Sequence, residues 1–331
     1  NYVNSISERN STNYPLGPLF VSNQDIVSVY CDADINQHEG GTVSRALAGY
    51  PIGLEIVQSV YTWDSLDAVV ISYMIKNVSC DTLIDCWVGN IADIDIRDIN
   101  STVNGAANDH LNYYYNDSTL NMLYAWTDTT AGEGGKGFGY LGVALIETPA
   151  VVKIGNMKGY IREDQKAYTK DEQLGLVTTQ SWSIAADPIS DEQRYDWLAA
   201  GIKDTSASGD VRGLLSTGPF NFGPATVARF TVAYFFASPA KGGAADGTIE
   251  DITGLGVKTN KTLGSNIDES LIGKAKAVRE AYYQAAIISQ ITEQNSEQRI
   301  TLYPNPTNSA LSINSQNMNG YYYEVLSLSG V

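Results

Sequence analysis

Runs of residues typical of β-strands, some of which alternate apolar and polar positions, recur throughout the first 240 positions of the chain. Such alternation is typical of β-strands, because successive side chains of a strand point to opposite faces of a sheet. The runs are Ile26–Ile35, Leu54–Trp63, Ala68–Asn77, Ile84–Ile96, Leu111–Asn116, Leu120–Trp126, Phe138–Glu147, Ser181–Ala186 and Thr226–Ala237. Turn residues separate many of them, and the spacing predicts a mainly β protein, an antiparallel β-sandwich with a few peripheral helices.

Two segments have the pattern of helices instead. Ser190–Gly201 starts with Ser190 as an N-cap, carries Gln193 three residues later as in a capping box, and ends at a glycine. Ser265–Gln284 has the spacing of an amphipathic helix, with an apolar face made of Ile267, Leu271, Ala275, Val278 and Tyr282. We expect this second helix to pack on the outside of a sheet.

The domain organisation follows from a change of composition near residue 290. The body is predicted to cover residues 1–290, and the polar segment 291–298 is typical of a linker. Strand-like sequence starts again in residues 299–331 and is interrupted by Pro304 and Pro306. These prolines remove two backbone donors and favour extended geometry before each of them, so we expect a separate, small β-unit.

This tail carries the motif Leu302-Tyr303-Pro304-Asn305-Pro306, followed by the strand-like runs Ala310–Ile313 and Tyr323–Leu328. In these features it resembles the C-terminal sorting domain of proteins that Bacteroidetes export through the type IX secretion system. The resemblance implies a sorting signal at Tyr303, Pro304, Asn305 and Pro306, and the secretion machinery as a partner. It also implies export across the outer membrane to the cell surface or the medium. Only the first part of such a domain is matched, so the tail is expected to be an incomplete β-sandwich.

The body carries looser motifs at Ser22, Asp25, Tyr30, Asp32, Asp34, Asn77, Asp93, Asp95, Tyr114–Asn116 and Ser216–Phe220. In these it resembles uncharacterised secreted β-sandwich proteins that carry such tails. The chain departs from their pattern after the Asp-x-Asp element, where Ile96-Arg97-Asp98-Ile99 replaces an expected glycine and paired aspartate. The resemblance implies no activity.

Composition narrows the classes of partner. Hydrophobic residues make up 43% and charged residues 18% of the chain, which are values of a folded protein. The net charge of −16 argues against nucleic acid and anionic membrane surfaces as partners. No apolar run approaches the roughly 18 residues of a membrane-spanning helix, so we expect no membrane span.

The densest group of polar residues runs from Asp93 to Asp109. Asp93 and Asp95 are two positions apart on a predicted strand, so their side chains share one face at a separation of about 7 Å. Two carboxylates so placed repel each other, and a shared cation relieves the repulsion. Asp98 and Asp109 can add oxygen ligands from the following loop, and this hard-donor set predicts calcium.

Asp32 and Asp34 form a second, less complete set of oxygen ligands. Neither set has the spacing of an EF-hand. The alternative for both sets is a solvated acidic rim at the ends of strands. A further alternative is that Asp93 and Asp95 act as a carboxylate pair in glycoside hydrolysis.

Aromatic residues suggest a different kind of surface. Tyr113, Tyr115 and Trp126 can form a stacking platform for sugar rings, while core packing is the competing explanation. In an alternating strand, Tyr113 and Tyr115 face away from Tyr114.

Other chemistry finds little support. The glycine-rich Gly132–Gly137 is followed by a strand rather than a helix, which favours a hairpin loop over phosphate binding. The two histidines, His38 and His110, have no recognisable partner for nucleophilic catalysis. The three cysteines, Cys31, Cys80 and Cys86, are either buried thiols or include a Cys80–Cys86 bridge.

The sequence therefore favours a secreted or cell-surface binding protein whose ligand is a glycan or an extracellular protein, with no catalytic residue assigned. An extracellular polysaccharide hydrolase with paired carboxylates is one alternative. A purely structural surface module is the other.

Overall fold

The computed structural model describes residues 2–5, 22–32, 51–63, 65–96, 105–127, 138–154, 157–161, 172–203, 206–254, 257–260, 265–296, 301–303 and 312–314. The chain divides into two compact units, residues 1–286 and residues 287–331. The first unit contains the two larger sheets and is called the body below.

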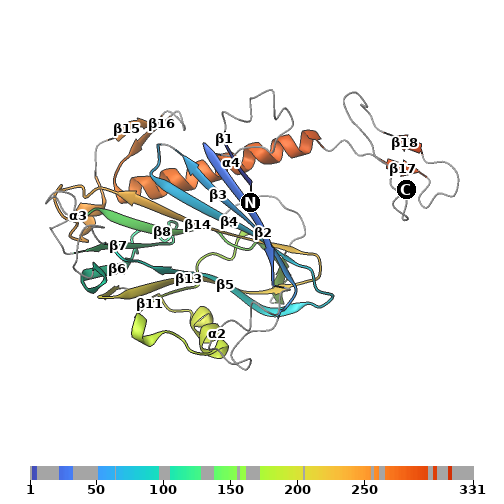
Figure 1. The fold of residues 1–331 in the computed structure, drawn as a ribbon, viewed down its shortest axis with the longest axis horizontal. Helices are drawn as coiled ribbons and strands as arrows, with labels where there is room; N and C mark the ends of the chain where they lie inside the picture. The colour runs from blue at the N-terminus through green and yellow to red at the C-terminus, as the bar shows by residue number, and fades with distance from the viewer. Residues whose placement is uncertain are drawn as a thin grey trace. The chain divides into compact units, whose positions relative to one another are not determined.

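A large antiparallel sheet forms the middle of the body (Figure 1). Its strands, in spatial order, are β1 (Tyr2–Ser5), β2 (Gln24–Cys31), β3 (Leu54–Trp63), β4 (Ala68–Asn77), β14 (Val227–Ala237), β8 (Tyr140–Glu147), β7 (Met122–Thr127), β6 (Asp109–Tyr113) and β12 (Ser206–Ser208). Most of these strands coincide with the alternating runs of the sequence. The mainly β prediction is confirmed.

A smaller sheet faces the large one. Its centre is β13 (Val211–Phe222), which pairs antiparallel with β11 (Thr178–Ser183) on one side and with β5 (Leu83–Asp93) on the other. Near its end, β13 also pairs in parallel with β10 (Met157–Ile161), which pairs with β9 (Val151–Ile154). The two sheets together make the sandwich.

Apolar residues divide into layers that follow the two faces of the large sheet. One face packs against helix α4 (Leu271–Ser296), where Val70, Phe235 and Val278 belong to one buried cluster. The opposite face packs against the small sheet, where Leu215 and Val232 are fully buried. Helix α2 (Asp191–Ala199) lies on the outer side of the small sheet (Figure 1).

Helix α2 follows its sequence signals. The Ser190 hydroxyl accepts the backbone N–H of Gln193 at 3.2 Å, as an N-cap does. The Gln193 side chain reaches one residue further back than in a capping box and accepts the N–H of Ile189 at 2.8 Å. Gly201 has a φ of +67°, the conformation in which a glycine ends a helix.

Helix α4 starts six residues later than the sequence pattern predicts. Residues 265–268 form strand β16 (Ser265–Asp268), which pairs with β15 (Val257–Asn260). The helix then begins at Leu271 and continues to Ser296, so the predicted linker is helical as far as that residue. The predicted buried face is confirmed at Leu271, Ala275, Val278 and Tyr282.

Arg279 fastens α4 to the large sheet. Its guanidinium donates to the carbonyl oxygens of Ile146, Leu145 and Leu120 at 2.8, 2.8 and 3.1 Å. These charge-assisted bonds tie the helix to the backbone of β8 and of the segment before β7. Remaining short elements are a 3₁₀ turn at Gly105–Asn108, another at Ile184–Ala186, and α3 (Ile249–Ile252).

The second unit contains one short hairpin among its described residues. Strand β17 (Thr301–Tyr303) pairs with β18 (Ser312–Asn314), and Leu302 is opposite Ile313. β17 ends at Tyr303, immediately before the predicted break at Pro304. Pro304, Asn305 and Pro306 lie outside the described residues.

Candidate functional site

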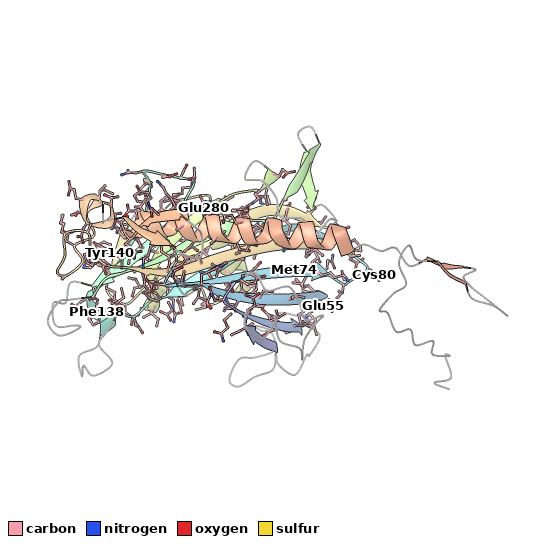
Figure 2. All side chains as sticks on the ribbon, turned by 90° about the horizontal axis from the view of Figure 1, so that it is seen from above. Glu55, Met74, Cys80, Phe138, Tyr140 and Glu280 are labelled. Atoms are coloured by element: carbon pink, nitrogen blue, oxygen red, sulfur yellow. The ribbon has the colours of Figure 1, made fainter. Side chains whose placement is uncertain are left out.

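A cleft of about 700 Å³ lies at one end of the body. Because β14 runs antiparallel to both β4 and β8, its last residues lie beside the first residues of those strands, and Phe236 pairs with Leu141. The residues after β5, the turn before β4 at Asp67, and Lys274 of α4 complete the wall. Phe138 and Tyr140, both in the lining, mark this end in Figure 2.

The predicted carboxylates Asp93 and Asp95 both line the cleft. Both are exposed while Ile94 between them is buried, as the alternation predicts. Asp93 is not free, since Arg212 donates to its Oδ2 at 2.9 Å. Arg212 also forms an ion pair with Asp187, so one guanidinium joins two carboxylates. Asp93 therefore fastens the end of β5, and Asp95 remains the more accessible carboxylate.

Asp109 is a buried residue at the start of β6 rather than a loop ligand. Its Oδ2 accepts the backbone N–H of Ile96 at 3.1 Å, which holds the segment that follows β5. Its Oδ1 accepts no hydrogen bond from the described residues. Burial raises the pKa of Asp109 to about 6, the hydrogen bond from Ile96 opposes the rise, and the negative charge of Asp95 adds to it.

The predicted calcium set is only partly described. Asp98 and Asp34 lie outside the described residues. In the part of the chain that the structure describes, no three histidine, cysteine, aspartate or glutamate residues are grouped as metal ligands. The described members of the set are thus Asp93, Asp95 and Asp109, of which one is bound by Arg212 and one is buried.

Asp32, which follows β2, holds the backbone at the start of β3 by hydrogen bonds. Its carboxylate accepts the backbone N–H groups of Ile52, Gly53 and Leu54 at 2.7, 3.0 and 2.9 Å. Burial pushes the pKa of Asp32 upward, but the hydrogen bonds from these backbone groups outweigh it and hold the pKa below its ordinary value. This use of both oxygens explains why an acidic residue stands at the end of β2, and it competes with the predicted metal role.

The predicted aromatic platform is wrong at two of its three members. Tyr113 and Trp126 are buried, at 4% and 7% exposure, and only Tyr115 is exposed, at 48%. Trp126 stacks between His110 and Tyr124, and the backbone of Gly247 covers it. Trp126 belongs to the core because a loop distant in sequence closes over it, and Tyr113 belongs to the cluster between the two sheets.

The sequence analysis missed the aromatic residue that does stand exposed in the cleft. Phe236 is 56% exposed, whereas its neighbour Phe235 is fully buried against α4. Strand alternation separates the two rings onto opposite faces of the sheet. That alternation was the available signal, although it does not tell which face ends in solvent.

The cleft contains one ammonium group. Lys274 is almost completely buried, yet its Nζ forms an ion pair with Asp67 and lies 3.6 Å from Glu269. The long side chain passes through the apolar layer of α4 and ends at the cleft. Asp67, Asp93 and Asp95 are thus the three carboxylates of the lining, and Lys274 is its one ammonium, in the part of the chain that the structure describes.

The loop that contains Asp246, Gly247 and Asp251 is held next to the cleft by Tyr140, which also lines the cleft. The Tyr140 hydroxyl donates to Asp251 at 2.5 Å and accepts the backbone N–H groups of Asp246 and Gly247 at 3.1 and 2.8 Å. Burial, followed by the bond to Asp251, raises the pKa of Tyr140 far above its ordinary value. This hydroxyl stays neutral, so it serves to fix the loop.

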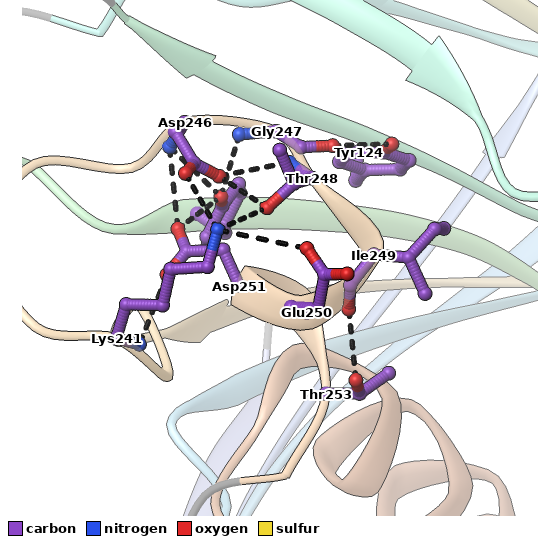
Figure 3. Close-up of polar contacts among 10 residues, drawn as sticks. Tyr124, Lys241, Asp246, Gly247, Thr248, Ile249, Glu250, Asp251 and Thr253 are labelled. Atoms are coloured by element: carbon purple, nitrogen blue, oxygen red, sulfur yellow. Dashed lines mark hydrogen bonds and ion pairs between the residues drawn. The ribbon is translucent and has the colours of Figure 1, made fainter.

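The surface of the same loop is held by an ion pair (Figure 3). The Lys241 ammonium donates to Asp246 at 2.9 Å and to the Thr248 hydroxyl at 2.7 Å. Hydrogen bonds from Thr248 and Lys241 lower the pKa of Asp246 to about 2. The Lys241 ammonium thus lies between two acidic side chains, 2.9 Å from Asp246 and 3.8 Å from Glu250.

The remaining candidates are resolved as follows. Cys31, Cys80 and Cys86 are free thiols; Cys31 and Cys80 are exposed, so neither the bridge nor the burial of all three holds. His38 and the glycine-rich Gly132–Gly137 lie outside the described residues.

No protein-family model matches this sequence, and no curated protein is significantly similar to it. Among the described residues, no helix combines the length and the apolar character needed to cross a membrane.

Proposed function

We propose that this chain is a secreted or cell-surface protein that binds a neutral carbohydrate in the cleft. One observation carries the proposal: Phe236, a ring exposed over 56% of its surface, stands in the same cleft as three carboxylates. Ligand sites typically combine an apolar wall with a few polar groups that fix orientation.

The chemistry of the lining suits a sugar ring. A phenyl ring offers an apolar face to the C–H face of a sugar, and carboxylates accept hydrogen bonds from its hydroxyl groups. The sugar is neutral because three carboxylates exceed the one ammonium, Lys274, among the described residues of the lining, and the whole chain carries −16. Uronic acids and sulfated sugars are repelled by such a field.

Calorimetry with neutral hexasaccharides of glucose, xylose and mannose, and with oligogalacturonate as the acidic comparison, tests this proposal. We expect at least one neutral series to bind, and Phe236→Ala to weaken it about tenfold or more. Tyr30→Ala removes a ring of similar exposure (44%) on β2, outside the cleft, and should leave affinity unchanged. Binding of the acidic series alone, or equal losses in both variants, contradicts the proposal.

A polysaccharide hydrolase is the second candidate. In its favour, Asp93 and Asp95 share the cleft, and the neighbouring Asp109 has a pKa raised to about 6, near the value of a general acid. Against this candidate, Asp109 does not line the cleft, and Asp93 accepts a hydrogen bond from Arg212. Release of reducing sugar that Asp95→Asn abolishes would favour hydrolysis over binding. Absence of both binding and release would leave the structural surface module.

We also propose calcium as a ligand of the acidic segment that begins at Asp93. Support comes from the exposed carboxylate of Asp95 and from Oδ1 of Asp109, which accepts no hydrogen bond from the described residues. Calcium at 100 times its dissociation constant adds about 2.7 kcal/mol, which raises the melting temperature by several degrees. The rise should vanish in Asp93→Asn/Asp95→Asn. Identical melts in calcium and in chelator would exclude the site.

We propose further that the tail directs export through the type IX system, as its motif at Tyr303–Pro306 suggests. In a bacterium that has this system, Pro304→Ala/Pro306→Ala should retain the protein inside the outer membrane. Undiminished export of the double variant would show that the motif is not the signal.

A further inference from the structure

The other end of the body holds a second cavity, of about 520 Å³, which is separate from the carbohydrate proposal. Strands β3, β4 and β14 of the large sheet, strands β5 and β13 of the small sheet, and helix α2 contribute its lining. Leu54 is part of this lining, and its neighbour Glu55 lies at the end away from Phe138 in Figure 2.

A change of strand register accompanies this cavity. From Arg212 to Thr217, β13 pairs with β5 residue by residue. Beyond that point Phe220 is opposite Cys86 and Phe222 is opposite Leu83, so each strand contains one extra residue. Extra residues of this kind bend and twist the strands, which lets the small sheet diverge from the large one.

The exposure of the side chains shows that the two sheets do not fully exclude water from their interface at this end of the sandwich. In the middle of the sandwich, Leu215 and Val232 are 0% exposed. Around Phe220 and Phe222, in contrast, the apolar neighbours remain only partly buried; they include Leu54, Ile75, Leu83 and Val88. Apolar surface left in water is unfavourable, so an apolar occupant that covers it would gain free energy.

Charges at the rim define the occupant further. Arg194 is the cation of the lining, and its guanidinium donates to Asp191 at 2.7 Å. Among the described residues of the lining, two carboxylates, Asp85 and Asp191, accompany this one guanidinium, and the resulting net negative charge disfavours an anionic head group. The Tyr195 hydroxyl donates to the Asp85 carbonyl at 3.2 Å, and its oxygen can still accept a hydrogen bond.

We propose that this cavity binds an uncharged apolar molecule that ends in a hydroxyl group, such as a long-chain or ring alcohol. The apolar part lies between the two sheets, against Phe220 and Phe222. The hydroxyl donates to the Tyr195 oxygen at the rim. The volume of about 520 Å³ is within the range of sites for small organic molecules.

Fluorescence of N-phenyl-1-naphthylamine, an uncharged apolar dye, tests the proposal with the full chain. We expect the dye to bind, and 1-dodecanol to displace it at least tenfold more effectively than dodecanoate. Ile56→Gln, which makes the lining polar, and Ala228→Leu, which fills it, should each weaken dye binding tenfold or more. Ile91→Gln is the matched control, because Ile91 is an exposed isoleucine of β5 that does not line the cavity.

The Tyr195→Phe variant tests recognition of the ligand's hydroxyl group independently of binding to the apolar lining. It should leave dye affinity within twofold and reduce the preference for dodecanol at least threefold. Thermal melts identify any variant that fails to fold, and Tyr195→Phe changes only an exposed hydroxyl. Equal dye binding by Ile56→Gln, Ala228→Leu and the control, or equal displacement by dodecanoate and dodecanol, would overturn the proposal.

Discussion

Replacing Asp109 by asparagine should stabilise the protein, and the gain should depend on pH. The ordinary carboxyl pKa of 3.8 is raised to about 6 in the folded chain, mainly because the group is buried. The folded state therefore keeps a proton at pH values where the unfolded state has lost it. Stability falls as the pH rises from about 4 to about 6, and the loss is complete above that range.

The size of the effect follows from the two pKa values. A rise from 3.8 to about 6 corresponds to about 3 kcal/mol of unfolding free energy at 1.36 kcal/mol per pH unit. Asparagine is neutral at every pH and retains an oxygen that can accept the Ile96 N–H. The difference in unfolding free energy between Asp109→Asn and the parent should thus grow by about 2.4 kcal/mol from pH 4 to pH 7, because part of the loss has already occurred at pH 4.

Urea unfolding at half-unit steps from pH 4 to pH 7.5 measures this difference. Any constant cost of the buried amide nitrogen cancels, because only the change with pH is compared. Asp95→Asn is the informative control: it removes a nearby negative charge and should move the transition of Asp109 to lower pH. Parallel stability profiles for Asp109→Asn and the parent would refute the reasoning.

Three further predictions concern stability and are checked by thermal or urea unfolding. Gly247→Ala should cost at least about 2 kcal/mol more than Gly254→Ala: both positions have positive φ, but only at Gly247 would a Cβ collide with a ring, that of Trp126. Equal losses would contradict the packing argument. Tyr140→Phe should cost about 1–3 kcal/mol, since the Gly247 N–H loses its acceptor and the buried Asp251 carboxylate loses one of its donors, while the Asp246 N–H still donates to Asp251. A loss below about 0.5 kcal/mol would count against it. Arg212→Met should cost about 1–2 kcal/mol, because two half-exposed carboxylates lose their shared partner; an unchanged melt would mean that the pairs are dispensable.

Much of the fold could be predicted because the strands of the large sheet are rich in apolar and β-branched residues, and in β4 and β6 burial also alternates along the strand. Strand β13 was not predicted. It lies in the centre of the small sheet and is buried on both faces over much of its length, so its sequence does not alternate, and it contains Gly218 and Pro219. The start of α4 was also missed, since Ser265–Asp268 fits the helical period but is paired as a strand.

In the candidate site, only features that depend on alternation along one strand, such as the exposure of a side chain, could be predicted from the sequence. The exposure of Asp93 and Asp95 follows from alternation within one strand. Their partners do not: Arg212 is 119 positions from Asp93 in sequence, and only the pairing of β5 with β13 brings the two together. Trp126 was misjudged for the same reason, because the residue that covers it, Gly247, comes from a distant loop.

The place of β14 in the large sheet has a consequence for folding. β14 lies between β4 and β8, so the two halves of the sheet, both made earlier in the chain, share no edge until it is added. Such long-range pairing costs loop-closure entropy and makes folding slow. Before residue 227 has been made, β4 and β8 each carry an unpaired edge rich in apolar residues, and such edges pair with other chains. We therefore expect aggregation to be greatest for chains cut off just before β14, and to fall sharply once β14 is complete.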